Sequence, residues 1–279
     1  MHPAELIVAD VALARRLERA EARANAEFVT ARAVAFPDSG AEWFEVAGAH
    51  AMYDGADSPC TQTFGLGMFE PVTNADLDRV EQFFRRRGAV VYHEICPLAD
   101  ASLIGMLNER GYQPFEFSSV LYRRIQDLPP ADASPGNSIQ ARRIERGEEK
   151  LWSRTAAEGW KDAAPGLDEF IYQLEQLIPH QPHGHNFVAE RAGEAIAAGA
   201  LFLSDGVALL AGASTIPKWR KQGAQRALLE RRLHYGAEHG CDVAMIVAAP
   251  GSASQRNAER EGFRIAYTRI KWRLPLPVA

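Results

Sequence analysis

The residues best suited to chemistry stand in a basic loop after Pro217, where a strand-like run ends. Lys218, Arg220 and Lys221 precede Gly223, at which an amphipathic helix begins. The start of a helix presents unpaired N–H groups and the positive end of its dipole to one point, which is how proteins hold phosphate groups. Glycine lets a phosphate approach the main chain closely. The segment therefore predicts a pyrophosphate site, and an ordinary basic loop before a helix is the alternative.

A second group with possible chemistry is the run His180, His183 and His185. Its spacing is compatible with metal ligation. Pro179, Pro182 and Gly184 place it in a loop, and no cysteine or carboxylate completes a ligand set nearby. We expect no metal, and we interpret the run as a solvent loop or as a wall of an acceptor pocket.

The elements around the basic loop alternate between strand and helix patterns. Gly223 opens a helix that ends at Gly240, and Ser252 and Gln255 have the spacing of a capping box before a helix that ends at Gly262. Asp-Gly and Ala-Gly pairs separate short apolar runs and predict hairpins. The predicted strands are 139–144, 186–191, 195–203, 207–216, 243–249 and 263–272, and further helices pass through Trp152, Trp160 and 170–178.

The earlier part of the chain repeats this order. Predicted helices cover 10–32, a segment through Leu77 and Phe84 capped near Thr73 or Asn74, and 103–110, and predicted strands cover 43–53, 61–68, 90–95 and 117–124. In both parts a buried strand ends at a proline, Pro97 or Pro250, and a helix ends at a glycine, Gly111 or Gly262. We interpret this as a tandem structural repeat. A linker at 127–138, rich in proline and small polar residues, divides it into domains 1–126 and 139–279.

Two segments of the later part resemble the GNAT superfamily of N-acetyltransferases. Arg220-Lys-Gln-Gly-Ala-Gln225 is similar to its motif A, Arg/Gln-x-x-Gly-x-Gly/Ala, with Gln225 at the last small position. Ser254-Gln-Arg-Asn-Ala-Glu-Arg-Glu-Gly-Phe263 is similar to motif B, in which a helix ends at Gly-Phe. The resemblance covers about 139–273. It implies an α+β fold with a mixed, mostly antiparallel sheet flanked by helices, in which strands 207–216 and 243–249 splay apart.

The resemblance also implies acetyl-CoA as the co-substrate and assigns its binding residues. Main-chain groups of the strand end pair with pantetheine and polarise the thioester, the loop and helix start hold the pyrophosphate, and the last helix lines the CoA tail. These residues are Ser214, Thr215, Ile216, Lys221, Gln222, Gly223, Ala224, Gln225, Arg226, Arg256 and Asn257. For Arg256 and Asn257 an exposed helix face is the alternative.

The general acid and base are not assigned by the resemblance. Family members often carry a tyrosine four residues before the motif-B glycine and an asparagine eleven before it, where this chain has Ala258 and Gly251. Substitutes by rough location are Ser254 and Tyr267 for the acid, and Glu158, His185 and Glu190 for the base. Each has a structural alternative in the core or at the surface.

The earlier part lacks the phosphate loop. Glu70, Asp76 and Asp78 stand where the basic loop should be, and carboxylates there cap a helix but repel a pyrophosphate. We interpret domain 1–126 as a degenerate GNAT-like partner and expect one CoA for each chain.

The composition limits the classes of partner that we expect the protein to bind. The net charge of −5 disfavours nucleic-acid partners, and no apolar run is long enough to cross a membrane. Cys60, Cys96 and Cys241 are interpreted as reduced thiols of a cytoplasmic protein. We expect a monomer or homodimer that acetylates a small-molecule amine, and a non-catalytic acyl-CoA-binding or sensing module is the rival.

Overall fold

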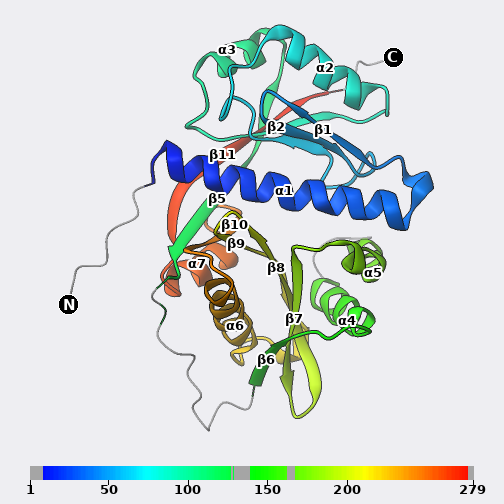
Figure 1. The fold of residues 1–279 in the computed structure, drawn as a ribbon, viewed down its shortest axis with the longest axis vertical. Coiled ribbons are helices and arrows are strands. Elements are labelled where there is room, and N and C mark those ends of the chain that lie inside the picture. The colour runs from blue at the N-terminus through cyan, green and yellow to red at the C-terminus, as the bar shows by residue number, and fades with distance from the viewer. Residues whose placement is uncertain (1–8, 127, 129–138, 162–166, 276–279) are drawn as a thin grey trace, which may run out of the picture. The chain divides into compact units, whose positions relative to one another are not determined.

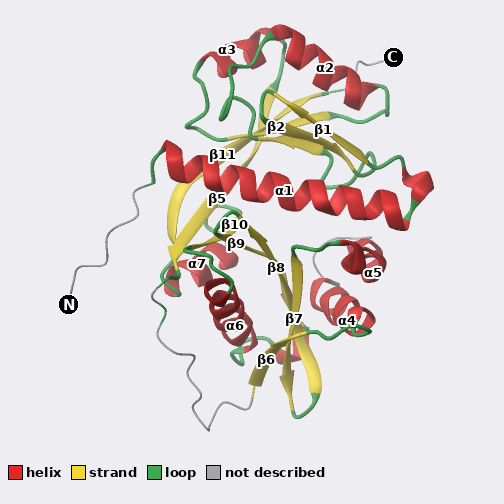
Figure 2. Ribbon diagram, viewed as in Figure 1, coloured by secondary structure: helices red, strands yellow, loops and turns green. Residues whose placement is uncertain are grey.

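The computed structural model describes residues 9–126, 128, 139–161 and 167–275, and these form two compact units. The first unit holds the described residues up to Arg123 and those from Ile246 onward, and the second holds those from Arg124 to Met245. The predicted linker 127–138 lies outside the described residues except for Leu128. Each unit is a mixed sheet with helices on its faces, as the α+β prediction requires (Figure 1, Figure 2).

The strands of the first unit follow the order β1-β2-β3-β4-β11-β5. Only β3 and β4 are parallel, and every other neighbouring pair in this unit is antiparallel. The last strand of the chain therefore lies between two strands of the earlier part. The bounds are β1 Glu42–Val46, β2 Ala49–Tyr53, β3 Gln62–Phe64, β4 Val91–Ile95, β5 Gln113–Arg124 and β11 Arg264–Leu274.

Helices cover both faces of this sheet. On one face α1 (Val11–Ala35) buries Ala26 and Val29 against Met52. On the other face α2 (Asn74–Arg85) and α3 (Ser102–Glu109) pack over Ala51, the neighbour of Met52 (Figure 1). Successive residues of a strand point to opposite faces, so β2 serves both cores. The remaining helix of this unit is α7 (Ala253–Arg260).

An ion cluster is buried beneath α1. Arg269 of β11 donates to Glu18 Oε1 at 2.7 Å and lies 2.6 Å from Glu21 Oε2, and both Arg269 and Glu18 are fully buried. Tyr267 donates to the same Glu18 oxygen at 2.8 Å. Removing one partner of such a cluster leaves an uncompensated buried charge, which costs several kcal/mol, about 3–5. The cluster ties β11 to α1.

The second unit carries its strands in the order β10-β9-β8-β7-β6, with β9 and β10 parallel and the other pairs antiparallel. The helices α4 and α5 cover one face, where Trp152 and Ile171 pack against Val188 and Ala198. On the other face, Tyr235 of α6 packs edge-on against Phe187. The bounds are β6 Ile139–Arg143, α4 Glu149–Trp160, α5 Leu167–Leu177, β7 Gly184–Arg191, β8 Glu194–Ser204, β9 Val207–Thr215, α6 Ala224–Glu238 and β10 Val243–Ala248.

Two features differ from the sequence predictions. The segment 43–53 is a hairpin and not one strand, because the chain turns at Ala47 and Gly48, with φ of +47° and +71°. The compact units also do not coincide with the predicted domains, because β11 pairs with β4 and β5 and thereby brings the end of the chain into the first unit. The compact units therefore follow strand pairing and not chain order.

Candidate functional site

A β-bulge interrupts β9 near its C-terminal end. The register with β8 shifts between Ala198 and Ala200, so that Gly212 and Ala213 together oppose Gly199. Gly212 has φ +57°, a left-handed conformation that glycine adopts without steric penalty. A bulge bends the strand and breaks the ladder, so the main chain at Gly212 is not held in regular pairing with β8.

The opposite edge of β9 is open along most of its length within the second unit. The parallel register joins Val243–Met245 to Val207–Leu209. From Leu210 to Thr215, the described part of this unit places no strand against that edge. Unpaired N–H and C=O groups at a strand edge bind extended chains through main-chain hydrogen bonds. The edge therefore suits an extended ligand that carries amide groups.

The loop after β9 delivers the chain into the start of α6. Gly223 is the N-cap residue with φ +96°, no side chain caps the helix, and its first turn holds no acidic residue. Ala227 N–H donates to the carbonyl of Gly223 at 3.0 Å, so the amides of residues 224–226 precede the first hydrogen bond of the helix. These donors and the helix dipole converge on one point, an arrangement that is able to hold an anion.

The basic residues of the loop differ in their contacts. Arg220 is exposed, and its guanidinium donates to the carbonyls of Gly159 at 3.1 Å and Thr215 at 3.3 Å. Lys218 forms an ion pair with Glu194 at 2.8 Å. Lys221 is exposed and has φ +62°. Arg220 thus links the loop to α4 and β9, and Lys221 is one of the exposed cations of the loop, next to the helix start.

The side chains predicted to bind CoA lie together in this region but are largely engaged with one another. Ser214 donates to the carbonyl of Ala156 at 3.1 Å, and Gln225 donates to the hydroxyl of Thr215 at 2.7 Å. Ile216 N–H donates to Ile196 at 3.0 Å, so that amide belongs to the sheet. The arrangement leaves main-chain groups as the ligand-facing donors.

Other predicted residues of this loop have local partners. Gln222 accepts a hydrogen bond from Arg191 at 2.5 Å and donates to Lys218 O at 3.2 Å. Arg226 pairs with Glu230 at 2.8 Å along the helix. Arg256 and Asn257 stand on the exposed surface of α7 in the first unit, where Arg256 donates to the carbonyl of Gly251 at 2.5 Å.

Most of the predicted catalytic residues have structural partners. Glu158 pairs with Lys161, and Glu190 accepts a bidentate interaction from Arg142 with distances of 2.7 and 3.1 Å. Tyr267 is buried against Glu18, and that burial raises the pKa of its hydroxyl. Ser254 is exposed on α7. None of these observations supplies an acid or a base.

His185 lies on β7, two strands from β9, and faces α6. Its Nδ1 is 3.4 Å from the Tyr235 hydroxyl. Burial, with Arg143 nearby, lowers the pKa of His185 to about 4. The residue also lines a pocket of about 260 Å³ with Arg143 and Asn186, near the end of the sheet where β9 begins. The basic loop follows the other end of β9.

Among the buried cations that the sequence did not reveal is one on α6. Arg232 of α6 is only 3% exposed, and it donates to main-chain carbonyls of β8 and β9. The signal was present in the helix pattern, because Arg232 stands three residues after Leu229 and next to Leu233, on the face that packs on the sheet.

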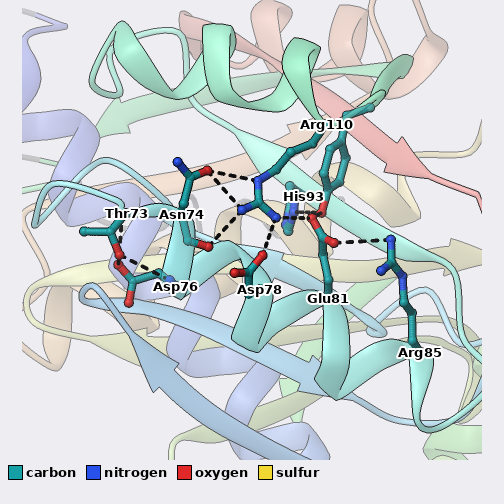
Figure 3. Close-up of polar contacts among 9 residues, drawn as sticks. Thr73, Asn74, Asp76, Asp78, Glu81, Arg85, His93 and Arg110 are labelled. Carbon is teal, nitrogen blue, oxygen red and sulfur yellow. Dashed lines mark hydrogen bonds and ion pairs between the residues drawn. The ribbon is translucent and has the colours of Figure 1, made fainter.

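The first unit contains a polar network at the place that corresponds to the basic loop (Figure 3). Thr73 and Asp76 form a complete capping box at the start of α2, and the hydrogen bonds from Thr73 lower the pKa of Asp76. Arg110 donates to the carbonyl of Asn74 at 3.0 Å and pairs with Asp78 at 2.8 Å. The start of α2 is therefore occupied by the side chains of Thr73, Asp76 and Arg110.

The same network reaches the sheet through Tyr112, which donates to Glu81 at 3.3 Å and lies 3.0 Å from His93 Nε2. Glu81 also pairs with Arg110 at 2.9 Å. The sequence predicted the carboxylates around α2, but Arg110 is remote in the chain and its role needed the fold. These contacts bind α2 to β4 and to the start of β5.

The chain is similar to known proteins in sequence profile and in structure. Residues 148–263 match the acetyltransferase (GNAT) family. No curated protein matches the chain. A GCN5-related N-acetyltransferase from Kribbella flavida has a TM-score of 0.60 and 19% identity, over 90% of this chain and 96% of that one. A tandem GNAT protein from the clavulanic acid biosynthesis pathway has a TM-score of 0.61 and 13% identity, over 96% of both chains.

A further similar structure is a GCN5-related N-acetyltransferase from Sphaerobacter thermophilus, with a TM-score of 0.56 and 18% identity over 76% of this chain and 71% of that one. At such identities the likeness concerns the fold. In the described residues, no helix is both long and apolar enough to cross a bilayer, and no group of three or more metal-ligating side chains is found.

Proposed function

Residues 148–263 make this chain a member of the GNAT superfamily, and from that premise we propose that it transfers the acetyl group of acetyl-CoA to the primary amine of a small molecule. The observation that carries the proposal is the start of α6, which has no side-chain cap and no acidic residue in its first turn. It follows directly on the bulged, open end of β9. A pyrophosphate at the helix start and an extended arm along β9 fit these donors.

Acetyl transfer has three requirements. The acceptor amine must be neutral when it attacks the thioester carbonyl. The oxygen of that carbonyl then gains negative charge and needs a preorganised N–H, which a main-chain amide at the β9 bulge supplies. The C–S bond breaks and CoA leaves as the thiolate or thiol. The attacking nitrogen loses its proton to a group that we leave unassigned.

The rival function, a non-catalytic acyl-CoA-binding or sensing module, has one observation in its favour. Ala258 stands where related enzymes often carry a tyrosine, and its side chain is buried at 3% exposure. No hydroxyl is available from this position. The binding features of β9 and α6 support both functions equally, so only turnover separates them.

A thiol-release assay with a panel of small primary amines tests the proposal. We expect free CoA to appear in step with the acetylated amine, and we expect no release above hydrolysis with the matched tertiary amines, which cannot form a stable amide. A folded protein that binds acetyl-CoA but releases no thiol with any amine would favour the sensing module.

The pH dependence of turnover tests direct attack by the amine. An alkyl amine resembles lysine, with a pKa of about 10.4, so its neutral fraction rises about tenfold for each pH unit below that value. We expect kcat/KM to rise between about pH 7 and pH 9 when chemistry limits the rate. A flat profile, with chemistry shown to be limiting, contradicts attack by a free amine.

A further inference from the structure

Arg232 is a buried cation that has main-chain carbonyls as its acceptors. Its Nε donates to Leu228 O at 3.1 Å, and Nη1 donates to Ala200 O at 2.8 Å and to Ala211 O at 3.3 Å. No carboxylate of the described residues lies within ion-pair distance of it. Burial lowers the pKa of Arg232 to about 10, which leaves the guanidinium charged at neutral pH.

Such a charge is costly in a core that leucine could fill. The effective penalty for burying an ion is several kcal/mol when no opposite charge is near. Carbonyl dipoles offset part of that penalty. A purely structural link between α6 and the sheet could be made by an apolar side chain, as Leu229 and Leu233 of the same helix show. The charge of Arg232 therefore indicates a role besides packing.

The guanidinium lies against the β-bulge. A Cβ atom added to Gly199 would come within 3.0 Å of the Cζ and Nη1 atoms of Arg232, so the absence of a side chain at Gly199 makes room for the cation. Nη1 then bridges one carbonyl from each strand, Ala200 of β8 and Ala211 of β9. Arg232 therefore fixes the peptide that enters the bulge, between Ala211 and Gly212.

The direction of that carbonyl sets the direction of the next amide. The described peptide bonds are all trans, and in a trans peptide C=O and N–H point in opposite directions. Because Ala211 C=O points toward β8 and Arg232, Gly212 N–H points away from β8. On that side, the described part of the second unit pairs no strand with β9 beyond Leu209.

We propose that Arg232 is a positioning residue for acetyl transfer: it holds and polarises the Ala211–Gly212 peptide so that Gly212 N–H donates to the acyl carbonyl oxygen. The inference rests on the proposed function and places the amide donor at Gly212, ahead of the residues 214–216 expected from the sequence. Drawing electron density toward the carbonyl makes the N–H of the same peptide a better donor.

The test compares Arg232→Met with Arg231→Met. Methionine keeps the apolar contacts of the aliphatic part of Arg232 without its charge, and Arg231 is the neighbouring residue that pairs with Glu238 at the surface. The readout is the ratio of the dissociation constants of CoA and acetyl-CoA, measured by calorimetry, because only acetyl-CoA carries the carbonyl that Gly212 would contact.

We expect the wild-type protein and Arg231→Met to prefer acetyl-CoA by about two- to tenfold, the worth of one hydrogen bond. In Arg232→Met the preference should fall close to one while CoA affinity stays within about twofold. With an active amine, kcat should fall by about 10- to 100-fold, and KM for acetyl-CoA should rise by no more than the two- to tenfold loss of preference. Unchanged preference and kcat in folded Arg232→Met overturn the proposal, as does a wild-type protein without preference.

Arg232→Lys keeps the test usable if the methionine variant does not fold. An ammonium group cannot bridge two carbonyls with the planar geometry of a guanidinium, so we expect an intermediate preference. A lysine variant equal to wild type in preference and kcat contradicts the proposal. A wild-type protein that binds acetyl-CoA selectively but acetylates no amine refutes the proposed function alone, since the binding ratio still reports on Arg232.

Discussion

Gly223 shows how a single residue prepares the phosphate site. Its φ of +96° is a conformation that other residues reach only at a cost of about 1–2 kcal/mol. A Cβ atom at this position would meet no atom within 4 Å, so a side chain there would extend into open space in front of the helix start. The backbone strain and the effect of a charge can therefore be separated by two substitutions.

We expect Gly223→Glu to weaken CoA binding by about five- to fiftyfold, because its carboxylate would face the pyrophosphate at close range. Gly223→Ala pays the same backbone cost without the charge and should stay within a few-fold of wild type. Calorimetric titration of CoA into both variants checks this. Equal affinities in folded Gly223→Glu and wild type would mean that the phosphates bind elsewhere.

His93 ties stability to pH in the first unit. Burial lowers its pKa from 6.5 to about 3, so the folded state binds fewer protons than the unfolded state between these values. The stability that neutral His93 contributes is complete above pH 6.5 and is lost as pH falls, by up to about 1.4 kcal/mol per pH unit. Glu94 acts in the opposite sense, because burial raises its pKa to about 7.

The contribution of His93 is separated from that of Glu94 by comparing wild type with His93→Gln, in which a side-chain amide replaces the imidazole near Tyr112. We expect the free energy of unfolding of wild type, relative to the variant, to fall as pH decreases from 6.5 toward 4. Urea unfolding at several pH values measures it. Parallel pH profiles for the two proteins would show that His93 does not titrate with a depressed pKa.

At the scale of elements, the sequence predicted what is local. The helix start at Gly223, the Thr73 cap and the turn at Asp205-Gly206 all have neighbours in the chain that set their conformation. The turn at Ala47-Gly48 was missed because apolar residues continue on both sides of it, although the same Ala-Gly pair at 192–193 predicts a hairpin. The bulge at Gly212 depends on pairing with β8, which a single strand pattern does not contain.

The contact between α4 and β9 is an element-scale feature with a sharp test. A Cβ atom on Gly159 would lie 2.6 Å from Ser214 Cβ and 3.1 Å from Thr215 N, closer than real contacts allow. We expect Gly159→Ala to destabilise the second unit by about 1–3 kcal/mol and to raise KM for acetyl-CoA, since β9 must move.

Gly105→Ala is the matched control for Gly159→Ala. Gly105 lies inside α3, where an added Cβ atom meets nothing within 4 Å. The substitution should stabilise the protein by about 0.5–1 kcal/mol, because alanine favours helix. Thermal unfolding measures both variants. If Gly159→Ala were as stable as wild type, the close packing of α4 on β9 would be wrong.

On the scale of the whole molecule, the repeat gives two related helix starts with opposite chemistry. The start of α6 is open, whereas Thr73, Asp76 and Arg110 occupy the start of α2. From the sequence, the carboxylates near α2 are expected to repel a pyrophosphate. That repulsion is weakened, because Arg110 forms an ion pair with Asp78. The capping box is the stronger obstacle to phosphate binding, because it occupies N–H donors that a phosphate would need.

We therefore expect each chain to bind one CoA. A calorimetric titration should saturate at one CoA for each chain, and Gly223→Glu should weaken the single binding event without revealing another. Saturation at two for each chain, or residual binding with full affinity in that variant, would assign a second site to domain 1–126.

The position of β11 between β4 and β5 has a consequence for biosynthesis. A ribosome releases β11 after every other described strand, so β4 and β5 emerge with unfilled edges facing each other. At about 5–20 residues per second, the stretch from 126 to 262 takes about 7 to 27 seconds to make. Open strand edges are sites of aggregation during that interval. The first unit therefore cannot finish folding before β11 has been made, and a nascent chain cut short before Arg264 lacks this central strand.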